Sequence, residues 1–255
     1  MPRYKLTLEY HGAPFVGWQR QREGVSVQGC LEDALAHFDP APGPVQGAGR
    51  TDAGVHATGQ VAHVDLARAW APFRLTEALN AHLRPHPIAV LGAEAVPETF
   101  HARFDARLRT YRYRILIRRA PLALEAGLAW QVRHPLDVAA MAAAARHFEG
   151  HHDFSAFRAA QCQAASAFKT LDRFVTAEKN HPNGDHEVVF EIEARSFLHN
   201  QVRSMVGTLE RIGAGKYPVN RLIQALKSGE RRLCGPVAPP QGLTLTNVQY
   251  ISEIL

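Results

Sequence analysis

Cysteine is scarce in this sequence. The 255 residues include three cysteines, Cys30, Cys162 and Cys234, which lie far apart and form no C-x-x-C pair. An odd number of widely spaced thiols argues against a disulfide framework and against a cysteine zinc site. A chain of this length can bury a sizeable core without such cross-links. We therefore expect a protein of a reducing compartment, the cytoplasm.

Long apolar runs and a targeting segment are also missing. The first twenty residues carry charges early and evenly, beginning with Arg3 and Lys5, which is unlike a signal peptide. No apolar run is long enough to cross a bilayer. The sequence therefore predicts a soluble cytoplasmic protein with no membrane partner.

A glycine-rich stretch, GAGRTDAGVHATGQVAHVD from Gly47 to Asp65, contains an acidic residue that needs an explanation, Asp52. Gly47, Gly49 and Gly54 remove Cβ atoms on both sides of this acid, as is needed where a ligand or another backbone must come close. The same residues also fit a plain turn, in which Asp52 bonds its own backbone and Gly54 supplies a positive φ. The loop alone leaves both interpretations open.

Two phosphate-binding motifs are absent from this loop. After Gly47 and Gly49, a dinucleotide-binding fingerprint needs a third glycine where Asp52 stands. A nucleoside triphosphate loop needs a Gly-Lys-Ser/Thr sequence, which does not follow. The glycines therefore do not indicate a nucleotide cradle of either kind.

Acidic residues are fewer than basic ones. There are 24 Asp and Glu against 29 Lys and Arg, which gives a net charge of +5 and a sequence pI near 9.3. Most of the excess is arginine, whose planar guanidinium suits phosphate. Six arginines crowd one segment: Arg107, Arg109, Arg112, Arg114, Arg118 and Arg119. This distribution predicts an anionic partner, with nucleic acid as the leading class.

Apolar periodicity predicts strands and helices that alternate along the chain. Strands are expected over residues 3–10, 58–66, 88–96, 107–118, 168–177, 187–194 and 243–251. Helices are expected from the Ser26 cap to residue 38, and over residues 72–83, 135–148, 198–212 and 220–227. On the strand 107–118, Tyr111 and Tyr113 share one face by period two.

This order of elements predicts an α+β fold. Two similar α/β halves would share a central mixed or antiparallel sheet with helices on one side. The expected break lies near residues 98–104, so that residues 1–104 form an N-terminal half with the Asp52 loop, and residues 105–255 form a C-terminal half. No residue-level repeat supports a duplication, which rests on element order alone.

Several sequence blocks match known motifs in order. They are HGAPFVGWQRQ, SVQGCLEDAL, GAGRTDAGVHATGQVAH, FHARFDARLRTYRYRI, GHHDFSAFRAAQC, FLHNQVRSMVG and APPQGLTLTNVQY. Together they resemble the tRNA pseudouridine synthase A family over essentially the full length. Three positions depart from the usual family pattern, His11, His86 and Phe168, and none of them lies in the motifs of the candidate site.

The resemblance implies a tRNA isomerase with the pseudouridine synthase fold. Such an enzyme converts uridine to pseudouridine at positions thirty-eight to forty in the anticodon stem-loop and uses neither metal nor cofactor. Asp52 matches the family's catalytic aspartate. The reaction cleaves the bond between N1 and C1′, turns the uracil and rejoins it through C5. A carboxylate can attack C1′ or remove a ribose proton to give a glycal, and attack on the base is a third route. The sequence does not choose among them.

Three further residues match family positions. Tyr111 matches the motif tyrosine that stacks on the target base, Arg203 the basic residue that pairs with the aspartate, and Arg50 an arginine proposed to fill the gap left by the extruded uridine. Each also has a plain structural alternative: a core tyrosine, as expected of Tyr113, a solvated arginine in the middle of a helix, and a phosphate contact. The resemblance also implies a homodimer with tRNA lying across both subunits.

Two other function classes compete with this interpretation. One is a metal-dependent RNA or phosphoester hydrolase, with ligands from Asp52, His56, His63 and the run at residues 151–153. Fourteen histidines make such groupings easy to find by accident, and HHDF also fits a polar loop. The other is an RNA-binding module without catalysis. Against it, an acid in a basic cleft weakens RNA binding and makes sense mainly as a reagent.

Overall fold

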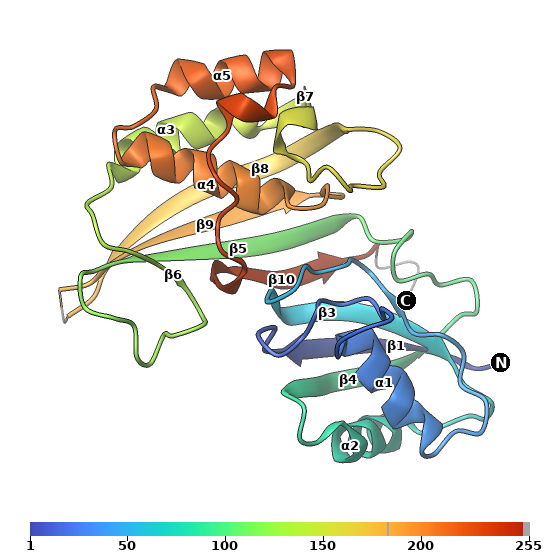
Figure 1. Ribbon diagram of the computed structural model, residues 1–255. Coiled ribbons are helices and arrows are strands. Elements are labelled where there is room, and N and C mark those ends of the chain that lie inside the picture. The colour runs from blue at the N-terminus through green and yellow to red at the C-terminus, as the bar shows by residue number, and fades with distance from the viewer. Residues whose placement is uncertain (183, 252–255) are drawn as a thin grey trace. The chain divides into compact units, whose positions relative to one another are not determined.

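The computed structural model describes residues 1–182 and 184–251, which fall into two compact units (Figure 1). The first unit comprises Met1–Arg109 together with the residues from Thr244 onward, and the second comprises Thr110–Leu243. The units are bounded differently from the two sequence halves. The first unit extends past the expected break at residues 98–104 and also takes in most of the last strand.

The first unit is built on a mixed sheet. Its strands follow the order β4 (Ile88–Val96), β1 (Arg3–Tyr10), β3 (His56–Asp65) and β10 (Leu243–Gln249), and β2 (Gln46–Gly47) pairs with β3. β1 runs antiparallel to both β3 and β4, whereas β10 runs parallel to β3. This sheet therefore joins the last strand of the chain to the strand that follows the Asp52 loop.

Two helices belong to the first unit, α1 (Val27–Ala36) and α2 (Pro72–Leu83). The Ser26 side chain caps α1 by accepting a hydrogen bond from the Gly29 amide at 3.1 Å, as the sequence predicts. In α2, Pro72 occupies the first turn, where its missing N–H costs no helical bond. The leucine stripe of α2 is fully buried, and this helix packs against β4.

The second unit contains the remaining strands. Its strands follow the order β5 (Leu108–Ile117), β9 (His186–Ala194), β8 (Phe168–Asn180) and β7 (Gly150–Asp153), and β6 (Trp130–Val132) runs parallel to β5. The interpretation of HHDF as a polar loop was wrong. His151, His152 and Asp153 pair antiparallel with β8, because Gly150 turns the chain back along it with a φ of +96°.

Three α-helices cover one face of these strands (Figure 1), α3 (Val138–Ala145), α4 (Gln201–Gly213) and α5 (Val219–Ser228). The helix expected over residues 135–148 is shorter, because Asp137 caps its start by accepting from the Ala140 amide and its end tightens into a 3₁₀ turn. Further 3₁₀ turns occur at Ser155–Phe157, Arg231–Leu233 and Pro240–Gly242, besides the one at Arg146–Phe148.

The start of α4 also differs from the expected position. The apolar spacing predicts a helix from Leu198, but Asn200 has a φ of +62° and sets the helix start at Gln201. Arg203 is therefore in the first turn of α4 and not in the middle of a helix.

The combination of sheets and helices confirms the α+β class. Ten strands and five α-helices occur in the part of the chain that the structure describes. Over these same residues, no helix combines the length and apolar character that a membrane span requires.

Candidate active site

Asp52 lies in a loop, residues 48–55, that joins β2 to β3 in the first unit. The start of this Asp52 loop is tied to β3: the Ala48 amide donates to the Val61 carbonyl at 2.7 Å, and the Gln60 side chain donates to the Gly49 carbonyl at 2.8 Å. The Val55 amide donates to the Asp52 carbonyl at 3.1 Å and closes a turn. The predicted turn is thus present, and it holds the half-buried Asp52 in a backbone that is fixed on both sides.

The segment 11–18 packs against the Asp52 loop, backbone to backbone. The Trp18 amide donates to the Thr51 carbonyl at 3.0 Å. At Gly17, whose φ is +113°, an added Cβ would lie 2.7 Å from the same carbonyl oxygen, so only glycine fits. On the other side, a Cβ at Gly47 would lie 2.5 Å from the Trp18 indole. The close approach predicted from the glycines is therefore made by another segment of the same chain.

A buried network of side chains holds the residue that precedes Asp52. The hydroxyls of Tyr10 and Thr51 are 2.8 Å apart, and the Gln60 amide donates to the Tyr10 hydroxyl at 3.4 Å. Burial raises the pKa of Tyr10 to about 12, so its hydroxyl stays protonated. Tyr10 is not predictable as a site residue from the sequence, because nothing in its spacing distinguishes it from the other inward residues of β1.

The Arg109 side chain bonds the start of the Asp52 loop. Its side chain is buried, and its Nη2 donates to the Ala48 carbonyl at 2.6 Å and to the Arg103 carbonyl at 2.8 Å. One guanidinium thus joins the Asp52 loop to the segment that precedes β5. Arg50, by contrast, is exposed on the Asp52 loop, two residues before the acid.

The arginine cluster at residues 107–119 has two kinds of members, which corrects its assignment to phosphate binding as a group. Arg109 is buried, Arg114 pairs with Glu125 and Glu187, and Arg118 pairs with Asp185. The remaining three, Arg107, Arg112 and Arg119, are exposed. Only the exposed members are open to an anionic partner.

Tyr111 and Arg203 both belong to the second unit. The Tyr111 ring, on β5, meets the Phe197 ring edge to face, with centroids 5.2 Å apart. Its neighbour on the same face, Tyr113, is fully buried and donates its hydroxyl to the Pro239 carbonyl at 2.7 Å. The core role expected of Tyr113 is therefore confirmed.

Hydrogen bonds within its unit hold the Arg203 side chain. Its Nε donates to the Ala238 carbonyl and its Nη1 to the Asn200 side chain, each at 2.8 Å. The Ala238 amide returns a bond to the Arg203 carbonyl at 3.0 Å. A fully solvated helix arginine would not be fixed in this way. The structure thus places Asp52 and Arg50 on one loop of the first unit, and Tyr111 and Arg203 on β5 and α4 of the second.

The histidines of the metal alternative have structural partners. In the first unit, His56 Nδ1 accepts from the Gly12 amide at 2.9 Å, and His63 Nδ1 accepts from the Ala102 amide at 3.1 Å. In the second unit, His152 Nε2 bonds the Glu149 carbonyl at 2.7 Å. No three His, Cys, Asp or Glu side chains within residues 1–182 and 184–251 form a group able to hold a metal ion. These contacts favour structural roles for the histidines.

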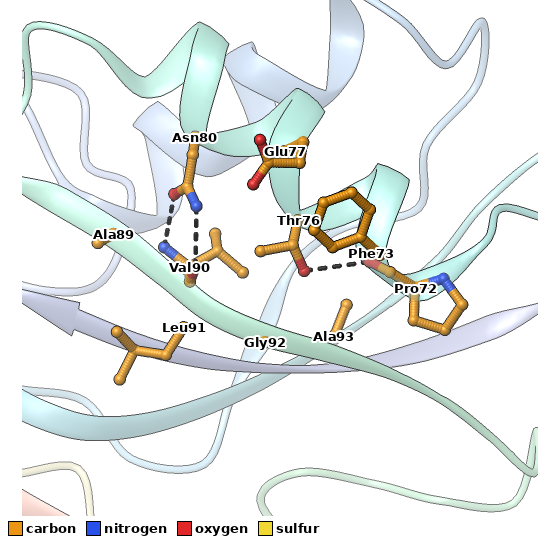
Figure 2. A pocket seen from close by; sticks show the side chains of 10 residues that line it. All are labelled: Pro72, Phe73, Thr76, Glu77, Asn80, Ala89, Val90, Leu91, Gly92 and Ala93. Carbon is orange, nitrogen blue, oxygen red and sulfur yellow. Dashed lines mark hydrogen bonds between the residues drawn. The ribbon is translucent and has the colours of Figure 1, made fainter.

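A surface groove of about 570 Å³ lies elsewhere in the first unit, between α2 and β4 (Figure 2). The Asn80 side chain bridges it by bonding both the amide and the carbonyl of Val90. Its lining contains one charged residue, Glu77, and exposes Phe73 and Leu91. An acidic and apolar lining does not suit a phosphate-bearing ligand, so the Asp52 loop remains the candidate site.

Comparison with known proteins identifies the family. A family profile described as tRNA pseudouridine synthase matches residues 7–105 and 144–251. The chain belongs to this family. Similar proteins named tRNA pseudouridine synthase A occur in Cereibacter sphaeroides, 57% identical over 253 residues and covering 99% of both chains, and in Dinoroseobacter shibae, 58% identical over 250 residues and covering 98% of this chain and 97% of the relative.

A third relative with the same name, from Beijerinckia indica, is 57% identical over 253 residues, which are 99% of this chain and 95% of the relative. The matches extend through both units of the structure. They confirm the predicted family, its fold class and the predicted enzyme class, a tRNA pseudouridine synthase, which is an isomerase.

The Tyr10 network predicts a defect in catalysis by this synthase when the hydroxyl is removed. Tyr10→Phe should leave Thr51 without its buried partner and lower kcat about tenfold with a smaller change in KM, since misplacing a reacting group slows chemistry more than binding. Stability should fall by about 1–2 kcal/mol. The measurement is steady-state pseudouridine formation together with thermal unfolding.

Tyr4→Phe is the matched control for this prediction. Tyr4 is buried on the same strand, and its hydroxyl bonds the backbone of Trp70, not the Asp52 loop. It should lose similar stability and keep kcat. Equal kcat values for the two variants would contradict a positioning role for Tyr10.

The lowered pKa of His63 predicts that the free energy of unfolding falls in mild acid. Burial, with smaller contributions from Arg3 and His101, lowers its pKa to about 4, whereas an unfolded histidine titrates near 6.5. Between these values the unfolded chain binds more protons, so the free energy of unfolding falls as the pH falls, by about 2 kcal/mol at pH 5 from this residue. His63→Asn keeps an acceptor for the Ala102 amide but does not titrate.

Thermal unfolding at pH 7 and pH 5 checks this expectation. The drop in Tm between the two values should be smaller for His63→Asn than for the unmodified chain. The exposed His147, changed to Asn, provides the control and should leave the drop as it is. An unchanged drop in the His63 variant would show that this ring does not set the acid sensitivity.

Proposed function

We propose that this protein converts uridine to pseudouridine in the anticodon stem-loop of tRNA, at positions thirty-eight to forty, with Asp52 as the catalytic nucleophile. One observation carries the proposal. In a chain of this family, the single acid of the GRTDAG motif is held half-buried on a loop fixed by backbone bonds from β3 and from segment 11–18. A fixed carboxylate suits this reaction, because the carboxylate must be held in one position against the ribose of the target uridine.

The carboxylate of Asp52 can act in two balanced ways. It can attack C1′ and displace N1, so that the uracil leaves with the bond electrons and an ester to the ribose forms. After the uracil turns, C5 attacks C1′, the carboxylate departs, and C5 loses its hydrogen as a proton. Alternatively, Asp52 removes the C2′ proton as N1 leaves with the bond electrons, which gives a glycal. C5 then bonds to C1′ while the protonated Asp52 returns the proton to C2′, and C5 loses its hydrogen as a proton. Both routes end with the same carbon to carbon bond.

The other candidate residues have supporting roles in this proposal. Tyr111 stacks on the target base, and Arg203, already fixed by Ala238 and Asn200, pairs with the Asp52 carboxylate and holds its rotamer. Arg50 is exposed and fills the gap left by the extruded uridine. The exposed arginines contact phosphates, which makes binding dependent on salt. A cytoplasmic homodimer, with tRNA lying across both subunits, completes the proposal.

Loss of the Asp52 carboxylate should abolish turnover and spare binding. With tRNA labelled with tritium at uracil C5, the intact chain should release tritium in buffer with EDTA, because C5 must lose its hydrogen. Asp52→Ala should release none and bind tRNA with a similar Kd. Asp172→Ala, at an exposed aspartate on β8, is the control and should behave as the intact chain does.

Two results would overturn this proposal. Tritium release that persists in Asp52→Ala would remove the role of the acid. Tight tRNA binding with no release by any variant would favour the RNA-binding module.

Removal of the Arg203 guanidinium should slow the reaction without preventing binding. Arg203→Ala is expected to lower kcat about a hundredfold, the scale of losing one electrostatic contact at a reacting centre. Arg203→Lys should recover part of that loss, because it restores the charge but not the planar fork. Arg211→Ala, on the last turn of the same helix, should have little effect. A lower Tm with an unchanged kcat would leave Arg203 with a structural role only.

A further inference from the structure

A large apolar side chain is exposed in the turn that precedes β5. The turn, residues 100–106, buries Phe100, Ala102 and Ala106 completely or nearly so. Phe104 points the other way, and 65% of it is exposed. The Arg103 guanidinium lies 5.6 Å from the centre of its ring. The turn therefore presents an aromatic ring and a cation together at the surface.

This turn is fixed by hydrogen bonds, so the exposure of Phe104 does not come from a loose loop. The His101 amide donates to Asp105 Oδ2 at 2.7 Å, and the Asp105 amide donates back to the His101 carbonyl at 3.1 Å. The Ala102 amide donates to His63 Nδ1, and the Ala102 carbonyl accepts from the Tyr250 hydroxyl at 2.7 Å. Such a scaffold fixes the backbone that carries the ring, which lowers the cost in ordering entropy when a ligand binds.

Arg109 connects this turn to the Asp52 loop within the first unit. Its Nη2 bonds both the Arg103 carbonyl and the Ala48 carbonyl, so the residue before Phe104 and the start of the Asp52 loop share one guanidinium. Arg50 on the Asp52 loop is exposed, and so are Arg103 and Arg107, which flank Phe104 in the chain. The turn that carries Phe104 is thus joined to the start of the Asp52 loop, and exposed arginines occur in both segments.

An exposed aromatic ring among arginines has the chemistry of a platform for an unpaired nucleobase. Bases stack on aromatic rings and on arginine planes, while the phosphates that flank them meet the positive charges. Extrusion of a uridine unstacks its neighbours and leaves base faces without partners. A ring fixed beside the Asp52 loop would cover such a face.

We propose that Phe104, flanked by Arg103, stacks on an unpaired base of the tRNA bound at the Asp52 loop and is a substrate-binding residue of this synthase. This inference rests on the proposed function. Stacking on a protein ring contributes about 1–3 kcal/mol per base, which corresponds to a change in Kd of about 5- to 150-fold. Because stacking releases no counterions, it adds affinity without adding to the salt dependence.

The test compares Phe104→Ala and Phe104→Trp with a matched control. Phe73→Ala removes an equally exposed ring, 69% accessible, from α2 in the groove of Figure 2. The Kd for tRNA is measured at several salt concentrations, and tritium release is measured under single-turnover conditions. Phe104→Ala should raise Kd at least fivefold with an unchanged salt slope, Phe104→Trp should restore binding, and Phe73→Ala should bind as the intact chain does.

A further variant separates stacking from charge. Arg103→Ala should weaken binding and also reduce the salt slope by about one, the signature of a lost phosphate contact. If Phe104→Ala does the same, the ring acts through Arg103 and not by stacking, and the inference fails. It also fails if Phe104→Ala leaves Kd unchanged.

The tritium measurement keeps this inference distinct from the proposed function. If the intact chain releases tritium, and Phe104→Ala has the same Kd and the same rate as the intact chain, only the inference about Phe104 is contradicted. If the intact chain binds tRNA and releases nothing, the proposed reaction fails, while the comparison of Kd values still decides whether Phe104 contacts the RNA.

Discussion

The contact between segment 11–18 and the Asp52 loop is the constraint on which the rest of the first unit depends. The Trp18 amide bonds the Thr51 carbonyl, and Gly17 lets the two backbones meet where any Cβ would clash. A loop held only at its two ends could swing its carboxylate by more than the fraction of an ångström that catalysis tolerates. Segment 11–18 and the Asp52 loop therefore stabilise each other.

Buried polar groups complete this support, and each one has a partner. Tyr10 and Gln60 hold Thr51 and Gly49, and Arg109 holds Ala48. In a buried site an unmet donor or acceptor costs more than a hydrogen bond gains, so such a network resists rearrangement. The support is consequently stiff without any disulfide, in keeping with the three free cysteines of the described chain.

The sequence predicted most elements and the family, because apolar spacing and caps report local structure directly. Ile88–Val96 and Pro72–Leu83 begin and end as expected, and Ser26 caps α1. One error arose where a long-range partner decides, and another where the backbone conformation of a single residue decides. Residues 151–153 form a strand because β8 lies beside them, and α4 begins late because Asn200 adopts a left-handed conformation. Motif matching identified the candidate site residues, Asp52, Arg50, Tyr111 and Arg203. Apolar spacing alone does not distinguish them from other residues.

The arginines show why charge counted along a sequence is a poor guide to a binding surface. On one strand and its flanks, Arg109 turns inward to carbonyls and Arg114 to two glutamates, while Arg112 remains exposed. Alternation along a strand separates the faces, but it does not say which face meets a carbonyl, a carboxylate or solvent. A guanidinium that serves the fold is lost to RNA binding. The basic character available to tRNA is thus smaller than the composition suggests.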